Sequence, residues 1–172
     1  MTTQEIEKYL MALNDELSLL GVKGEICLYG GAVMCLVYQA RPATKDVDAV
    51  FKPTSQIREA AERVAMTFRL PSDWLNDAVK GFVVAHPQRA ILDFPALKVY
   101  APEPDYLLAM KTLASRVESA DKVDILFLIK LLGLKAADEV FAILEQYYPR
   151  QQIKPATQFF VEELFEELDQ QK

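Results

Sequence analysis

The chain has 172 residues, which is enough for one domain with a sizeable core, with or without a helical appendage, and too few for two full domains. Hydrophobic residues make up 51% of the sequence and charged residues 26%, proportions that exclude an intrinsically disordered chain. The formal net charge of -6 argues against a general affinity for nucleic acid, because that affinity depends on many lysine and arginine side chains.

The N-terminal segment predicts a helix, because a capping box is followed by apolar residues at helical spacing up to Gly21. A short apolar run at 25–29 predicts a strand, which ends at the adjacent residues Gly30 and Gly31. The apolar segment 32–40 then predicts a buried helix. The first elements are therefore a helix, a strand, a glycine turn and a second helix.

The next segment, 46–51, alternates apolar and polar residues and predicts a strand with one polar edge. One apolar stripe over 55–68 predicts another helix, and 72–81 predicts a short one. Three further strand candidates lie at 81–85, 90–94 and 96–101.

From Pro104 onward the pattern is helical, in four segments at 105–117, 122–133, 136–148 and 156–169. The sequence thus predicts an α+β fold in which a small mixed β-sheet with flanking helices, residues 1–102, precedes a C-terminal helical region, 103–172, that packs on it. The start of the sequence lacks the pattern of a signal peptide, and no apolar run reaches ~18 residues, so we expect a cytoplasmic protein without membrane association.

Two aspartates, Asp46 and Asp48, stand one residue apart in the predicted strand, so their side chains are expected on the same face, with Cα atoms ~6.5 Å apart. Side by side they would repel each other, and a divalent cation between them removes that conflict. Carboxylate oxygens favour Mg²⁺ or Mn²⁺, which usually bind through one or two carboxylates and the phosphates of a substrate.

The glycine turn supplies a site for such phosphates. Glycine lets the backbone turn tightly and approach a ligand closely, and the helix after Gly30 and Gly31 presents its N-terminal N–H groups to an anion. A Gly-Gly turn alone is more often a plain turn, and a D-x-D pair alone is commonly an exposed strand face. Their combination in this order, with a helix between them, is more specific.

Together these residues resemble the signature of the nucleotidyltransferase superfamily related to DNA polymerase beta, in which a Gly-Gly turn and a helix precede a D-x-D strand. The chain is similar to the small bacterial branch that includes the AbiEii-type nucleotidyltransferase toxins. The T-x-D-h-D strand of that branch is matched by Thr44, Asp46 and Asp48, and its upstream basic residues are matched by Arg41 and Lys45.

The resemblance implies a nucleotidyltransferase fold, a two-metal site with Mg²⁺ or Mn²⁺, and transfer of a nucleoside monophosphate from an NTP to a hydroxyl or phosphate acceptor. It also implies a third carboxylate on a neighbouring strand, beside Asp46 and Asp48. Asp93, with apolar residues on both sides, is the candidate for this catalytic and metal-binding acid. The alternative is an ordinary turn residue at the end of a strand.

The resemblance extends to a helical segment that carries Lys111, Arg116 and the pair Asp121 and Asp124. Lys111 is a candidate for binding the triphosphate, and the alternative is a solvated lysine on an amphipathic helix. For Asp121 and Asp124 we expect helix capping or pairing with Lys122 or Arg116 rather than metal binding.

The function predicted from these residues is a Mg²⁺-dependent nucleotidyltransferase that acts on an RNA such as tRNA, a protein or a small molecule, with a toxin–antitoxin role implied by the resemblance alone. Its candidate substrate-binding residues are Gly30, Gly31, Thr44, Lys45 and Lys111. The alternative is a catalytically inactive member of the fold that serves as a binding or antitoxin-like module, with a protein partner or as a homodimer. The acidic composition favours this alternative slightly, since enzymes that act on tRNA usually show a basic face.

Overall fold

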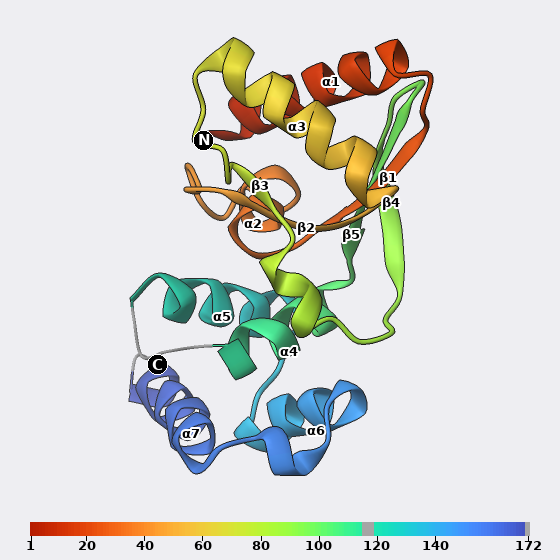
Figure 1. Cartoon of the computed structure of the whole chain (residues 1–172). Helices are drawn as coiled ribbons and strands as arrows, with labels where there is room; N and C mark the ends of the chain where they lie inside the picture. Colours follow the sequence, from red (N-terminus) through yellow and green to blue (C-terminus); the bar gives the residue numbers. More distant parts are fainter. Residues whose placement is uncertain (115–118, 171–172) are drawn as a thin grey trace. The chain divides into compact units, whose positions relative to one another are not determined.

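The structure, a computed structural model, describes residues 1–114 and 119–170 (Figure 1). The chain divides into two compact units, which we describe separately. The first contains Met1–Val83 and Gln88–Pro102, and the second contains Val84–Pro87 and the residues from Glu103 onward. The first unit combines a mixed sheet with helices, and the regular elements described in the second unit are helices, which confirms the predicted α+β class.

The first unit is built around a five-stranded sheet in the order β3-β2-β1-β5-β4. Strands β1 and β2 pair antiparallel, as do β4 and β5, whereas β1 pairs with β5 and β2 pairs with β3 in parallel. The elements of this unit are α1 (Thr3–Leu19), β1 (Gly24–Leu28), α2 (Gly30–Leu36), β2 (Val47–Lys52), α3 (Thr54–Phe68), β3 (Leu75–Asn76), the 3₁₀ helix η1 (Ala78–Gly81), β4 (Gln88–Asp93) and β5 (Leu97–Pro102).

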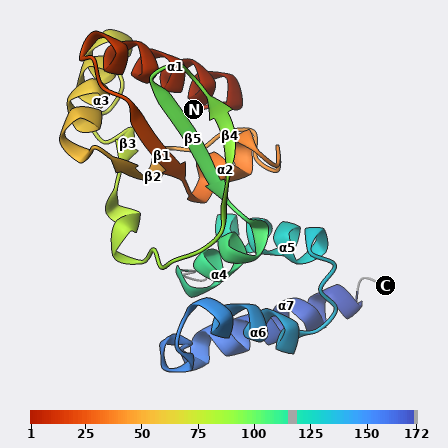
Figure 2. The ribbon, with the colours of Figure 1, turned by 90° about the vertical axis from the view of Figure 1, so that its right-hand side faces the viewer.

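Helices α1 and α3 lie side by side against one face of this sheet (Figure 1, Figure 2). The alternation in β2 shows why: Val47, Ala49 and Phe51 are buried beneath the helices, whereas the intervening residues are only half-buried. The capping box of Thr2 and Glu5 starts α1 as the sequence predicts. One face of the sheet therefore carries the core, and the side chains of Asp48 and Val50 point to the other face.

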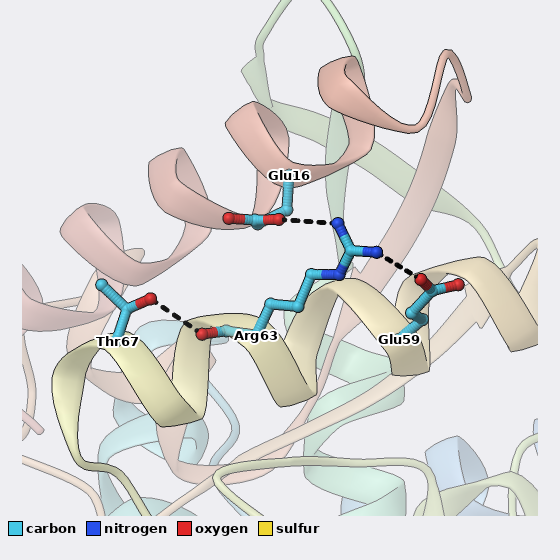
Figure 3. Close-up of polar contacts among 4 residues, drawn as sticks. All are labelled: Glu16, Glu59, Arg63 and Thr67. Atoms are coloured by element: carbon cyan, nitrogen blue, oxygen red, sulfur yellow. Dashed lines mark hydrogen bonds and ion pairs between the residues drawn. The ribbon is translucent and has the colours of Figure 1, made fainter.

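Arg63 of α3 ties the two covering helices together (Figure 3). Its guanidinium contacts Glu16 of α1 at 3.5 Å and Glu59, one turn earlier in α3, at 2.6 Å. The Thr67 hydroxyl donates a hydrogen bond to the Arg63 carbonyl oxygen at 2.9 Å. These groups are partly exposed, so the pairs contribute little stability, and the apolar stripes of α1 and α3 carry most of the packing energy.

The second unit consists of helices, which are α4 (Pro104–Ala114), α5 (Ser119–Leu131), α6 (Ala137–Tyr147), the 3₁₀ helix η2 (Arg150–Gln152) and α7 (Pro155–Gln170). Tyr106 of α4 is fully buried, and its hydroxyl lies 3.1 Å from that of Tyr148. The ring of His86 stacks on Tyr106 with their centroids 3.8 Å apart, and the Tyr106 hydroxyl accepts a hydrogen bond from the Val84 N–H. These contacts place 84–87 in the helical unit. No helix within the described ranges is both long and apolar enough to cross a membrane.

The segment 72–81 differs from the sequence prediction, which gave it a short helix. Leu75–Asn76 instead forms β3, and only Ala78–Gly81 is helical. Trp74 explains this difference, because its buried indole donates a hydrogen bond to the Ala61 carbonyl at 3.0 Å, and its own carbonyl accepts one from the Val47 N–H at 2.7 Å. The anchored chain therefore extends the sheet alongside β2.

Two further expectations are corrected. The segment 81–85 forms no strand, and α2 ends at Leu36 rather than near residue 40. The early end of α2 follows from a left-handed Gln39 with φ of 51°, after which the Ala40 N–H donates a hydrogen bond to the Met34 carbonyl at 2.9 Å. This hydrogen bond turns the chain back onto the last turn of the helix.

Candidate functional site

The turn between β1 and α2 holds Gly30 directly against Asp48. Gly30 has φ of 59°, a left-handed conformation that favours glycine. A Cβ atom at this position would lie 2.8 Å from Oδ2 of Asp48, so any side chain here would displace the carboxylate from its present position. The Tyr29 N–H donates a hydrogen bond to the Asp48 carbonyl oxygen at 2.8 Å, which extends the β1–β2 pairing up to the turn. The structure thus brings Gly30 and Asp48 together.

The second glycine is covered by side chains of the segment that leads into β2. A Cβ atom at Gly31 would collide with the Thr44 hydroxyl and would lie 3.4 Å from Nη1 of Arg41. Thr44 is held in place, because its N–H donates to the Met1 carbonyl at 2.9 Å and its hydroxyl donates to the Asp46 carbonyl at 3.3 Å. A hydroxyl and a guanidinium group therefore converge on Gly31.

The two aspartates are not equivalent in the structure. β2 begins at Val47, so Asp48 lies in the strand and Asp46 lies in the bend before it. The prediction of a single strand from 46 to 51 is therefore one residue early. Both side chains are half-buried, and Lys45 between Thr44 and Asp46 is exposed. The alternation that places Asp48 opposite the core does not by itself fix the direction of the Asp46 side chain.

Asp93 does not join this group. Asp93 ends β4. Across the sheet it is in register with Lys98 of β5, then with Glu25 of β1 and finally with Lys52 at the end of β2. Asp48 lies near the opposite end of β2, about 13 Å from Lys52 along the strand at ~3.3 Å per residue. Three strand spacings of ~4.8 Å also separate β4, which carries Asp93, from β2, which carries Asp48. The register of the sheet therefore places Asp93 far from Asp48, so the structure does not bring the predicted third acid to the other two.

The residue that stands next to Asp48 on its other side is Asn76. Strand β3 pairs with β2 in parallel, with Asp48 opposite Asn76. Sequence patterns missed Asn76 because β3 has only two residues and lies inside a segment with helical composition. Arg41 was matched only as an upstream basic residue, and the contact with Gly31 gives it a definite place.

Lys111 belongs to the helical unit, where carboxylates surround its ammonium group. Nζ lies 2.6 Å from Asp124 and 3.3 Å from Asp121, and the Lys111 and Asp124 side chains are 8% and 0% exposed. Lys111 is thus not a solvated lysine. Asp121 and Asp124, for which helix capping or pairing with Lys122 or Arg116 was expected, both contact Lys111. Arg116, the remaining residue of that motif, lies outside the described residues.

Two carboxylates belong to this region, because Asp48 lies against Gly30 and Asp46 precedes Asp48 by two residues. Such a set suits Mg²⁺ or Mn²⁺, which complete their coordination with water and phosphate. Over the described part of the chain, no group of three or more His, Cys, Asp or Glu side chains could hold a metal ion. No family model, no curated protein and no solved structure matches this chain. What the site does must therefore be argued from its own residues.

Proposed function

We propose that this chain is a Mg²⁺-dependent nucleotidyltransferase and that the turn at Gly30 and Gly31 binds the metal complex of an NTP. The observation that supports this proposal is the position of the Asp48 carboxylate against the Gly30 backbone. A metal-binding carboxylate and a turn that a phosphate can approach closely are thereby within reach of one Mg²⁺–triphosphate complex.

The residues around the turn take distinct roles in this proposal. Asp46 and Asp48 hold Mg²⁺ or Mn²⁺, which, when bound, would neutralise charge on the triphosphate. Arg41 lies beside Gly31 and donates hydrogen bonds to phosphate oxygens, and Lys45 adds an exposed positive charge. Thr44, also beside Gly31, donates to a phosphate oxygen in exchange for its 3.3 Å hydrogen bond to the Asp46 carbonyl. The acceptor is an RNA, a protein or a small molecule, whose hydroxyl or phosphate oxygen replaces pyrophosphate on the α-phosphorus of the NTP.

A second candidate function is binding of the Mg²⁺–nucleotide without transfer, as a binding or antitoxin-like module. The observation in its favour is the place of Asp93 at the far end of the sheet, which leaves two carboxylates near the turn. Two carboxylates are sufficient to hold Mg²⁺ together with phosphates, whereas a two-metal transfer reaction commonly uses more acidic ligands.

Labelled nucleotides distinguish the two functions. The full chain is incubated with NTPs labelled at the α-phosphate, Mg²⁺, and total RNA or cell lysate, and compared with Asp46→Ala, Asp48→Ala and the distant control Asp93→Asn. Transfer by the wild type and Asp93→Asn, but not by the other variants, supports the nucleotidyltransferase. Mg²⁺-dependent binding that Asp48→Ala abolishes, without any transfer, supports the binding module. Equal labelling in all four proteins contradicts the proposed site.

A further inference from the structure

Asn76 is the side chain that the sheet places nearest to Asp48 on the neighbouring strand. The parallel pairing of β2 and β3 aligns Val47 with Leu75 and Asp48 with Asn76. Partners in adjacent strands point to the same face of a sheet, and adjacent strands are ~4.8 Å apart. The Asn76 amide and the Asp48 carboxylate are therefore neighbours.

Burial shows which face these two side chains share. Val47 and Leu75 are 0% and 7% exposed and belong to the core beneath the helices. Because side chains alternate along a strand, Asp48 and Asn76 point to the opposite face, and both are half-buried. Asn76 therefore lies on the face of the sheet that carries the Asp48 carboxylate.

The orientation of the Asn76 amide is fixed by a backbone hydrogen bond. The Ala78 N–H donates to Oδ1 of Asn76 at 3.2 Å, and since a backbone N–H only donates, the atom that accepts must be the amide oxygen. The amide NH₂ group consequently points away from this contact and keeps its hydrogen atoms for other acceptors. On the preceding side, the buried Trp74 anchors the chain through its hydrogen bond to the Ala61 carbonyl.

The acid that follows Asn76 is engaged elsewhere. Asp77 forms an ion pair with Arg58 of α3 at 2.7 Å. The group beside Asp48 on β3 is therefore a neutral amide.

We infer that Asn76 is a nucleotide-positioning residue, whose amide NH₂ donates a hydrogen bond to a phosphate oxygen of the Mg²⁺–nucleotide that Asp48 holds. This inference rests on the proposed function and adds a third side chain to its site. Because an amide donor carries no charge, Asn76 contributes to the binding of the phosphate and not to the binding of the free cation. The cation and the nucleotide complex should therefore respond differently to substitutions at this position.

Two substitutions separate these contributions. Asn76→Ala removes the donor, so the affinity for the Mg²⁺–NTP complex should fall about tenfold, while the affinity for Mn²⁺ alone stays unchanged. Asn76→Asp keeps an oxygen for the Ala78 N–H and places a third carboxylate beside Asp48, so the affinity for Mn²⁺ alone should rise about tenfold. Asp93→Asn, at the far end of the sheet, should change neither affinity.

The affinities are measured by calorimetry with Mn²⁺ alone and with Mg²⁺–ATP and Mg²⁺–GTP, on full-length variants whose unfolding midpoints are recorded. The inference is overturned if Asn76→Asp binds Mn²⁺ no more tightly than Asp93→Asn, or if Asn76→Ala retains the wild-type nucleotide affinity. Asp48→Asn distinguishes a failure of the Asn76 role from a failure of the proposed nucleotide site. Loss of binding in Asp48→Asn with no effect at Asn76 contradicts this inference alone, whereas unchanged binding in Asp48→Asn contradicts the proposed function itself.

Discussion

The carboxylate of Asp48 lies so close to Gly30 that a Cβ atom there would be 2.8 Å from Oδ2. The contact joins the end of β1 to the start of β2, and the left-handed φ of Gly30 makes it sterically feasible. The glycine is therefore required both for the shape of the turn and for the place of the acid. A substitution that disturbs one should disturb the other.

Replacing Gly30 by alanine should destabilise the fold and weaken the site together. A residue with a Cβ in the left-handed region costs about 1–2 kcal/mol, and the added methyl group displaces the Asp48 carboxylate. Urea unfolding and Mn²⁺ titration of Gly30→Ala measure the two effects. Gly21→Ala is the matched control, because Gly21 has a similar left-handed φ of 67° but nothing lies within 4 Å of a Cβ there. Wild-type Mn²⁺ affinity in Gly30→Ala would show that Asp48 does not bind the cation.

In the helical unit, Lys111 should contribute to the stability of the fold. Lys111→Met removes the ammonium group that lies 2.6 Å from the buried Asp124 carboxylate, and breaking a buried ion pair in this way typically costs about 3–5 kcal/mol. The double variant Lys111→Met/Asp124→Leu removes both charges and should lose much less stability than the single variant. Thermal unfolding measures the difference, with Lys122→Met as a control for a partly exposed pair. A Lys111→Met protein as stable as Lys122→Met would contradict the pairing.

Features that depend on residues close together in the sequence could be predicted from it. The capping box and apolar stripe predicted α1, and the stretch from Gly30 to Asp48 predicted that the glycine turn and the aspartate strand lie side by side, as Gly30 and Asp48 do. The place of Asp93 could not be predicted in this way. It depends on β5 inserting parallel to β1, which turns the β4–β5 hairpin so that Asp93 lies at the far end of the sheet.

A second failure of the sequence prediction has a different physical cause. The segment around Trp74 has helical composition, but the hydrogen bond from its indole to Ala61 and the pairing of β3 with β2 override that local preference. For the same reason, the sequence did not indicate that Asn76 lies beside Asp48. Local patterns therefore predicted the glycine turn and Asp48, whereas the formation of β3 beside β2 depends on tertiary contacts that these patterns do not contain.

A buried hydrogen bond between α1 and the β4–β5 turn should be worth more than an exposed one. The Ala96 N–H donates to Oδ1 of Asn14 at 2.8 Å, and Asn14 is 6% exposed. Asn14→Ala leaves that N–H without its acceptor and should lower the free energy of unfolding by about 1–3 kcal/mol. Asp15→Ala removes only the exposed acceptor of the Asn14 amide and should cost within about 0.5 kcal/mol. Equal losses in urea unfolding would contradict this assignment.

The thiol of Cys27 should make the fold sensitive to alkaline pH. Burial raises the pKa of Cys27 to about 11, above its ordinary value of 9.0. The folded state therefore retains the thiol proton more strongly, and stability that is fully present below about pH 9 should be lost as the pH rises toward 11. Urea unfolding between pH 8 and pH 11 tests this, and Cys27→Val should lose less stability over that interval than the wild type. The same decline in both proteins would contradict the role of Cys27.

The affinity for Mn²⁺ in the presence of an NTP tests most directly whether Asp48 holds the metal–nucleotide complex. It is measured from the electron paramagnetic resonance signal of free Mn²⁺. Asp48→Asn and Asp93→Asn make the same chemical change at opposite ends of the sheet. The proposed site predicts that Asp48→Asn weakens Mn²⁺–NTP binding at least about tenfold, whereas Asp93→Asn binds like the wild type. Equal affinities in all three proteins, or a loss in Asp93→Asn alone, would contradict it.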